Sequence, residues 1–218
     1  MHGHVWPAAV TTQASAMTSD WVLFIACGAG VALLVWGLIL FAVFRWRVRS
    51  SDDGGLPPQF SSNNVLEISW TLIPLALVIA LFVFTYRVEA RVEAVTPRPA
   101  VSVDVTGFRW GWTFAYAGGP TITGTALAPP QLVLPAGETT RISITSSDVN
   151  HAFWVPAFLF KRDAIPGLVT TFDLRPVETG TFQGHCAEFC GLQHALMGFT
   201  VRVVSPADYT AWLHGGHT

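Results

Sequence analysis

The sequence contains little charge and few basic residues. Only 12% of its 218 residues are Asp, Glu, Lys or Arg, about half the share in an average soluble domain. Lys161 is the single lysine, and no cluster of basic residues occurs. This distribution argues against a nucleic-acid partner. By contrast, 51% of the residues are hydrophobic, and 14 prolines with 19 glycines are too many for a purely helical bundle. The composition therefore predicts a membrane part joined to a turn-rich globular part.

Two long apolar segments, 21–44 and 65–86, dominate the first half of the chain. The first has no charge, and as a helix it would extend roughly 36 Å, enough to cross a hydrocarbon core of about 30 Å. The second carries Glu67 near its start and Pro74 inside. A buried helix of a soluble protein is the alternative for either segment, and a signal peptide for the first. Two such segments in one short chain favour membrane spanning, and the basic flank of the first follows its apolar run instead of preceding it.

The basic residues of this flank predict the orientation of the two helices. Arg45, Arg47 and Arg49 lie in the connecting segment 45–64, and no Lys or Arg precedes them. The positive-inside rule places this loop in the cytoplasm. The N-terminal tail, 1–20, and everything after residue 86 then lie on the outer side of the membrane. A bacterial plasma membrane and a mitochondrial inner membrane are both compatible with this topology, and the high Ala, Gly and Val content favours the bacterial one.

The second half of the chain has the pattern of an all-β domain. After a linker at 87–100, short alternating runs broken by Gly and Pro follow one another over 101–205, which is typical of strands. At least six strands in this length predict a Greek-key sandwich or barrel. The last segment, 206–218, begins with Pro206 and is expected to form a short helix and a tail.

A cluster of potential metal ligands lies near the C-terminus. Cys186, Cys190, His194 and Met197 fall within twelve residues, and His151 lies 35 residues before Cys186 at the start of a predicted strand. Thiolate and thioether sulfur favour copper over hard cations, and two thiolates are able to bridge a pair of copper ions. A disulfide and a Cys₂His₂ zinc site are the alternatives. Taken singly, His151 is more typical of an ordinary polar residue and Met197 of a core residue, so the combination carries the prediction.

Four stretches of the chain resemble subunit II of the haem–copper cytochrome c oxidases. They are VLEISWTLIP at 65–74, GFRWGWTF at 107–114, DVNHAFWVPAFLFKRDAIPG at 148–167 and GHCAEFCGLQHALM at 184–197. The last is similar to the loop of that family that holds a dinuclear copper centre, CuA. The resemblance implies a cupredoxin-type fold and two bound copper ions. The implied ligands are His151, Cys186, the main-chain carbonyl of Glu188, Cys190, His194 and Met197.

The same resemblance implies a function in respiration. The chain is expected to accept single electrons from cytochrome c and to pass them to a haem in subunit I, where oxygen is reduced to water with proton translocation. Subunit III and the lipid bilayer are further expected partners, and the chain is inactive alone. The Glu188 carboxylate is expected to share a magnesium ion with subunit I. Glu67 matches an acid at the cytoplasmic mouth of a proton pathway; its alternative role is to mark the membrane interface and favour the helix dipole.

Cytochrome c docking is assigned to an aromatic residue and to acids. Trp110 and Trp112 alternate along an expected strand and so face one side of it; core packing is the alternative for both. The resemblance assigns electron acceptance to Trp110 and leaves Trp112 as packing. Asp148 and Asp163 are the preferred acids for steering a basic cytochrome, and Asp173 and Glu178 are further candidates whose alternative is a solvated surface.

Two other functions are compatible with parts of this pattern. A copper-free scaffold subunit of a quinol oxidase shares the fold but lacks the ligands, all of which are present here. A membrane-anchored copper carrier without an oxidase would need only one anchor, whereas this chain has two apolar segments and Glu67. The electron-accepting oxidase subunit is therefore the favoured prediction.

Overall fold

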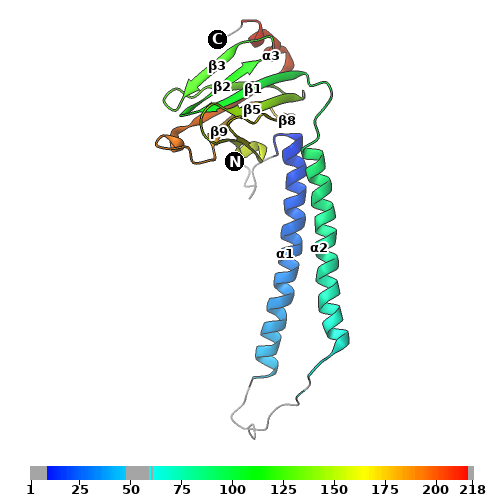
Figure 1. The fold of residues 1–218 in the computed structure, drawn as a ribbon. Helices are drawn as coiled ribbons and strands as arrows, with labels where there is room; N and C mark the ends of the chain where they lie inside the picture. Colours follow the sequence, from blue (N-terminus) through cyan, green and yellow to red (C-terminus); the bar gives the residue numbers. More distant parts are fainter. Residues whose placement is uncertain (1–8, 48–58, 60, 216–218) are drawn as a thin grey trace. The chain divides into compact units, whose positions relative to one another are not determined.

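The computed structural model describes residues 9–47, 59 and 61–215, which fall into two compact units (Figure 1). One unit, Ser19–Glu89, holds most of both long helices, and the other combines Met1–Thr18 with Ala90–Thr218. We refer to the second unit as the β-domain. Arg49, used above to predict orientation, lies outside the described residues, whereas Arg45 and Arg47 lie inside them.

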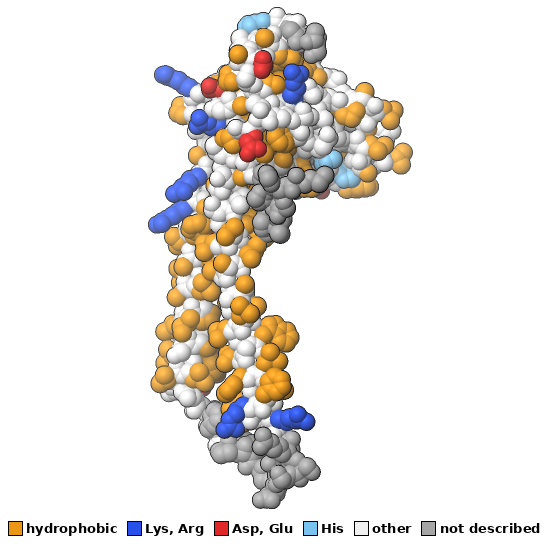
Figure 2. All heavy atoms as spheres, turned by 180° about the vertical axis from the view of Figure 1, so that it is seen from behind, with side chains coloured by type: hydrophobic (Ala, Val, Ile, Leu, Met, Phe, Trp, Pro, Cys, Tyr) orange, Lys and Arg blue, Asp and Glu red, His pale blue; other side chains and the backbone are white. Residues whose placement is uncertain are grey.

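The two predicted apolar helices are present, and both are longer than the apolar runs. Helix α1 spans Thr12–Arg45 and α2 spans Asn64–Val92, and both are long and apolar enough to cross a membrane. At the start of α2, the side chain of Asn63 accepts a hydrogen bond from the backbone N–H of Leu66, and that of Glu67 accepts one from the backbone N–H of Asn63. This reciprocal capping fixes where the helix begins. Hydrophobic side chains cover the visible faces of the helices (Figure 2).

The β-domain contains two five-stranded sheets. Their strand orders are β3-β2-β1-β5-β8 and β4-β10-β9-β6-β7. Strands β1 and β5 pair in parallel, as do β4 and β10, and the other pairs are antiparallel. The strands are β1 Val101–Phe108, β2 Gly111–Tyr116, β3 Thr121–Thr125, β4 Gln131–Pro135, β5 Thr140–Ser146, β6 His151–Val155, β7 Phe160–Ala164, β8 Thr170–Leu174, β9 Gly180–Cys186 and β10 Gly198–Val204.

The core of the β-domain is built largely from aromatic rings. Alternate residues of the strands are buried, as in β5 and β10, which is the period expected when one face of each sheet packs inward. Phe153 of β6 stacks on Phe199 of β10 with ring centroids 4.6 Å apart, and Trp112 contacts both rings edge to face. After the last strand, helix α3 (Pro206–Leu213) begins at Ser205, whose side chain accepts a hydrogen bond from the backbone N–H of Asp208.

The segment before the first apolar run, predicted as a tail, packs against the β-domain over its described part. Val10, Thr11 and Ala14 are buried. The backbone N–H of Thr12 donates to the carbonyl of Arg175, and the N–H of Val177 donates to the carbonyl of Val10. These bonds attach residues 10–14 to the end of β8 and the chain that follows it.

A buried ion pair attaches the linker to strand β8. Asp173 of β8 is only 3% exposed and accepts hydrogen bonds from the backbone N–H of Thr96 and from the Arg141 guanidinium of β5. The Arg141 guanidinium also donates to the carbonyl of Thr96. Asp173 therefore does not belong to the exposed acids that could steer a cytochrome, because its carboxylate is buried and fully engaged.

We expect the change Asp173→Ala to lower the free energy of unfolding of the β-domain by about 2–3 kcal/mol, because hydrogen bonds to a buried charged group are lost. Denaturant unfolding of the full chain in detergent, followed by near-ultraviolet circular dichroism, measures this change. Asp104→Ala is the matched control, since Asp104 is exposed on β1, and should stay within about 0.5 kcal/mol of the unchanged chain. Equal stability of the two variants would contradict an anchoring role for Asp173.

Candidate metal centre

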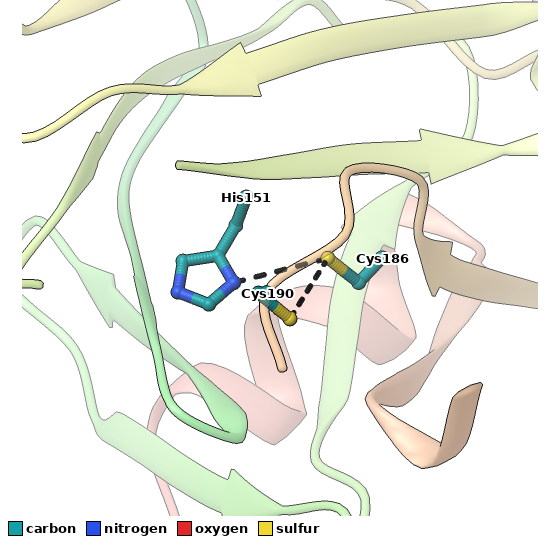
Figure 3. Close-up of side chains that lie close together, drawn as sticks. All are labelled: His151, Cys186 and Cys190. Carbon is teal, nitrogen blue, oxygen red and sulfur yellow. Dashed lines mark hydrogen bonds between the residues drawn. The ribbon is translucent and has the colours of Figure 1, made fainter. Parts of the chain in front are cut away.

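The predicted ligands come together because of how β6 and β9 pair. His151 begins β6 and Cys186 ends β9, and the register of the two strands places Phe153 opposite Cys186. Cys190 lies in the loop between β9 and β10, which we call the ligand loop (residues 186–197). Figure 3 shows the side chains of His151, Cys186 and Cys190 converging on one point.

The donor atoms form a continuous chain of short separations. The Cys186 Sγ atom is 3.8 Å from His151 Nδ1 and 3.9 Å from Cys190 Sγ. The Cys190 Sγ atom is in turn 3.6 Å from His194 Nδ1 and 3.7 Å from Met197 Sδ. The main-chain carbonyl oxygen of Glu188 lies 3.3 Å from Cys186 Sγ. All six donor atoms predicted from the sequence are thus gathered in one place.

These separations suit ligands that share metal ions. Two donors that each lie about 2.0–2.3 Å from one tetrahedral ion are about 3.3–3.8 Å apart, and the separations here are 3.3–3.9 Å. Six donors exceed the four that one structural zinc ion takes. Both cysteines are free thiols, and their sulfur atoms lie well beyond the disulfide bond length of about 2.05 Å. The donor set therefore fits a pair of soft metal ions better than a zinc ion or a disulfide.

Close packing holds the ligand loop in its path. Gly184, two residues before Cys186, lies against Phe199, and a Cβ atom there would come within 2.2 Å of the Phe199 ring. Gly191 has a φ of +112°, which L side chains rarely adopt, and a Cβ atom there would lie 3.2 Å from the Trp110 ring. The indole N–H of Trp110 donates to the carbonyl of Cys190 at 3.1 Å. Both glycines thus allow aromatic side chains to approach the loop closely.

Trp110 and Trp112 occupy different environments, so the expectation that they face one side of a strand is wrong. Trp110 lies in the turn that joins β1 to β2 and is half-buried, whereas Trp112 is on β2 and is 0% exposed. Its ring lies 6.1 Å from that of His151. Alternation along a strand applies only where a strand exists, and β2 begins at Gly111. Trp112 packs in the core, and Trp110 contacts the ligand loop.

The two thiols differ in acidity. Burial raises the pKa of Cys186, but the hydrogen bonds with His151, with His194 and with the backbone of Ala152 and Glu188 together outweigh it and lower the pKa to about 7. For Cys190, burial and the neighbouring charge of Cys186 raise the pKa to about 12. Burial also opposes the charged form of His151, but its contacts with Cys186 and Asp148 raise its pKa overall. A thiolate, the form that binds metal, is therefore already accessible at Cys186 near neutral pH.

The two acids predicted to dock cytochrome c lie in different settings. Asp163 of β7 has a side chain that is 47% exposed and pairs with Lys161 at 3.3 Å. Asp148 has a side chain that is 24% exposed, and its Oδ1 atom lies 2.9 Å from the Nε2 atom of the ligand His151. Sequence reasoning did not predict this contact, although a spacing of three residues between an acid and a ligand His is a usable signal.

The remaining predicted site residues lie at the edges of elements. Glu188 is half-buried in the ligand loop, and Glu67 is exposed in the first turn of α2.

Three apolar side chains of the ligand loop were not predicted as functional, yet they are exposed: Phe189 by 80%, Leu192 by 91% and Leu196 by 57%. Exposed apolar groups in such a cluster are typical of a contact surface.

Comparisons with known sequences find one family. The model of the family described as cytochrome c oxidase subunit II, periplasmic domain, matches residues 127–204. The chain is 37% identical to a probable cytochrome c oxidase subunit 2 of Streptomyces avermitilis, over 93% of this chain and 76% of that one. It is 32% identical to cytochrome c oxidase subunit 2 of Mycobacterium bovis, over 95% of this chain and 73% of that one.

Comparison with solved structures agrees with the sequence matches. The periplasmic domain of subunit II of cytochrome oxidase of Bradyrhizobium japonicum matches with a TM-score of 0.50 and 31% sequence identity, over 55% of this chain and 95% of that one. The match shows that the β-domain resembles the cupredoxin-like periplasmic domain of such subunits. Together with the two helices that are long and apolar enough to span a membrane, it confirms the predicted fold class.

Proposed function

Because the chain belongs to the cytochrome c oxidase subunit II family and is a component of that haem–copper oxidase, we propose that it is the subunit that accepts electrons. Cytochrome c would dock on the β-domain and give up one electron at a time. The electrons would pass to a haem in subunit I, which reduces oxygen. Subunit III and the lipid bilayer complete the proposed surroundings.

The single observation that carries this proposal is the set of six donors: two thiols 3.9 Å apart, with two imidazoles, a thioether and a carbonyl oxygen around them. Two copper ions held by this donor set would supply a one-electron couple. His151, Cys186, Cys190, His194, Met197 and the Glu188 carbonyl would hold them. A copper-free scaffold gives no reason for this convergence of donors, because buried thiols and imidazoles in an ordinary core need no such arrangement.

The chain's own residues would prepare the site for fast transfer. The ligands are fixed by β6, by β9 with its packed Gly184, and by Gly191 of the ligand loop, so little would move when the charge changes. Met197 is 1% exposed, Cys190 6% and Cys186 7%, which keeps water away from the sulfur atoms. Trp110 would receive the electron, since its ring lies against Gly191 and its N–H binds the carbonyl of Cys190.

Two carboxylates are proposed to serve subunit I. The Glu188 side chain would help to hold a magnesium ion at the boundary with that subunit, while its carbonyl faces Cys186. Glu67 would lie at the mouth of a proton pathway. Arg45 and Arg47 follow the apolar run of α1, which supports a cytoplasmic position for that end of the hairpin and hence for Glu67. The β-domain would then lie on the outer face of a bacterial plasma membrane.

The test is reconstitution of the full chain, purified in detergent, with copper. We expect two copper ions per chain, a visible absorption from thiolate ligation, and an electron paramagnetic resonance spectrum in which one unpaired electron couples to two copper nuclei. A stand-alone copper carrier would give the same spectrum but would be recovered from the membrane without haem, so co-purification with a haem-bearing subunit separates that alternative. A colourless protein, or one that holds a single zinc ion, would overturn the proposal.

A further inference from the structure

One carboxylate, that of Asp148, contacts both a proposed copper ligand and the turn that carries Trp110. Its Oδ1 atom lies 2.9 Å from His151 Nε2 and accepts the backbone N–H of Val149 at 2.6 Å. Its Oδ2 atom accepts the backbone N–H of Arg109 at 2.7 Å, and the Arg109 side chain lies 3.4 Å away. The hydroxyl of Ser146 is a further neighbour at 3.4 Å. Both oxygen atoms of Asp148 are therefore engaged inside the protein.

The His151 ring has little freedom apart from this contact. It is 0% exposed, and it lies so close to Gly107 that a Cβ atom there would be 3.1 Å from the ring. One nitrogen, Nδ1, faces the Cys186 sulfur, and the other, Nε2, faces Asp148. When Asp148 accepts a hydrogen bond from a protonated Nε2, Nδ1 carries no proton and its lone pair points at the thiols. This is the His151 tautomer that a metal ion requires.

The contact with Arg109 extends the influence of Asp148 to the ligand loop. Arg109 and Trp110 together form the turn between β1 and β2, and the Trp110 indole donates to the carbonyl of Cys190. The Asp148 carboxylate thus restrains the turn on one side and His151 on the other. No other side chain among the described residues is shown with hydrogen bonds to both.

The same contacts leave the Asp148 carboxylate poorly suited to attract a basic partner by its charge. Its side chain is 24% exposed, and its negative charge is offset locally by the Arg109 guanidinium. Asp163 also pairs with a cation, Lys161, but its side chain is 47% exposed, about twice the exposed fraction of the Asp148 side chain. Of the two acids, Asp163 is the one with the geometry of a docking residue.

We propose that Asp148 is a positioning residue of the copper centre, which fixes the tautomer and orientation of His151 and holds the Trp110 turn against the ligand loop. This role rests on the proposed function, since it presumes that His151 binds copper. It differs from the docking role predicted from the sequence, because it acts through ligand geometry instead of long-range charge.

The test compares Asp148→Ala with Asp163→Ala and Asp104→Ala, each in the full chain loaded with copper in detergent. Partners that orient a metal-binding His typically contribute ten- to hundredfold in metal affinity, so we expect Asp148→Ala to hold copper about ten- to hundredfold more weakly against a competing chelator. Its copper hyperfine splitting should also change. Asp163→Ala and Asp104→Ala should match the unchanged chain in both measurements.

A second readout uses the assembled oxidase and the salt dependence of its reaction with cytochrome c. Asp163→Ala should flatten the dependence of the KM for cytochrome c on ionic strength, and Asp148→Ala should leave that slope unchanged. Asp148→Asn keeps one oxygen acceptor, which can serve His151 or the Arg109 N–H but not both, so it should restore only part of the copper affinity. This variant also covers the case in which Asp148→Ala does not fold.

The outcomes separate the two proposals. A normal copper spectrum and affinity in Asp148→Ala or Asp148→Asn, together with a flattened salt dependence, would overturn the positioning role and restore the docking role. Absence of the two-copper spectrum from the unchanged chain would instead overturn the proposed function itself.

Discussion

Replacing Cys190 by serine is expected to abolish the two-copper spectrum and, in the assembled oxidase, the oxidation of cytochrome c. The Cys190 sulfur lies among three other donor atoms of the site: Cys186 Sγ, His194 Nδ1 and Met197 Sδ are all within 3.9 Å of it. A serine hydroxyl is a harder ligand, which copper in its lower oxidation state disfavours. It is also neutral at the pH at which a thiolate would bridge two ions.

The measurement is the copper-to-protein ratio and the paramagnetic resonance spectrum of the full chain, followed by turnover of the oxidase with cytochrome c. We expect the copper content to fall from two ions to one or none, and turnover to fall to the background of the assay. Cys27→Ser is the matched control, because Cys27 lies in α1, outside the ligand loop. It should keep both copper ions.

A serine variant that retained two coupled copper ions would show that Cys190 does not bridge them. The ligand assignment, and the proposed function with it, would then need another pair of bridging atoms, and the described residues around the site offer no third thiol. Loss of copper with retained cytochrome c oxidation would be equally damaging, since electrons would then bypass this chain.

The metal centre was predictable from sequence to the extent that its geometry is local. Cys186, Cys190, His194 and Met197 lie on one short loop, so their spacing along the chain nearly determines their spacing in the structure. His151 is the exception, at 35 residues from Cys186. Its position depends on the pairing of β6 with β9, which no local pattern encodes; the sequence offered it as a further donor at the start of a predicted strand, and the resemblance to a known family implied that it is a ligand.

The features that sequence reasoning missed depend on contacts between distant segments. Residues 10–14 carry no pattern that distinguishes a tail from a packed segment, because their partners lie after β8. An acid that steers a partner and an acid that orients a ligand are the same letter in a sequence, and only the 2.9 Å contact with His151 distinguishes Asp148. Trp110 lies in a turn because β1 ends and β2 begins on either side of it, and strand boundaries depend on pairing with neighbouring strands.

Trp110→Leu is expected to slow electron transfer from cytochrome c by about a hundredfold, the scale that a misplacement of about 1 Å costs at a reacting centre. The indole ring is the aromatic group that lies against Gly191 and is hydrogen-bonded to the carbonyl of Cys190. Leucine would remove both the ring and the N–H, so the docked donor would have no aromatic group between it and the ligand loop. The copper ligands themselves are untouched, so the copper spectrum should persist.

Stopped-flow mixing of the oxidase with reduced cytochrome c measures the change. Trp110→Phe separates the two parts of the effect: it keeps an aromatic ring but loses the hydrogen bond to Cys190, and we expect a smaller decrease than with leucine. Trp154→Leu is the control for loss of a partly exposed tryptophan, since Trp154 is 39% exposed on β6 and lies beside His185. It should leave the rate near that of the unchanged oxidase.

The nature of the donor decides what a slow rate means. A small soluble reductant does not need a docking surface, so it should reduce the copper centre of Trp110→Leu at nearly the normal rate. If both donors slow equally, the substitution has disturbed the copper centre through the Cys190 carbonyl, and Trp110 acts as support for the ligand loop. If only cytochrome c slows, the ring is the point at which electrons reach this chain, because the ligands behind it still work.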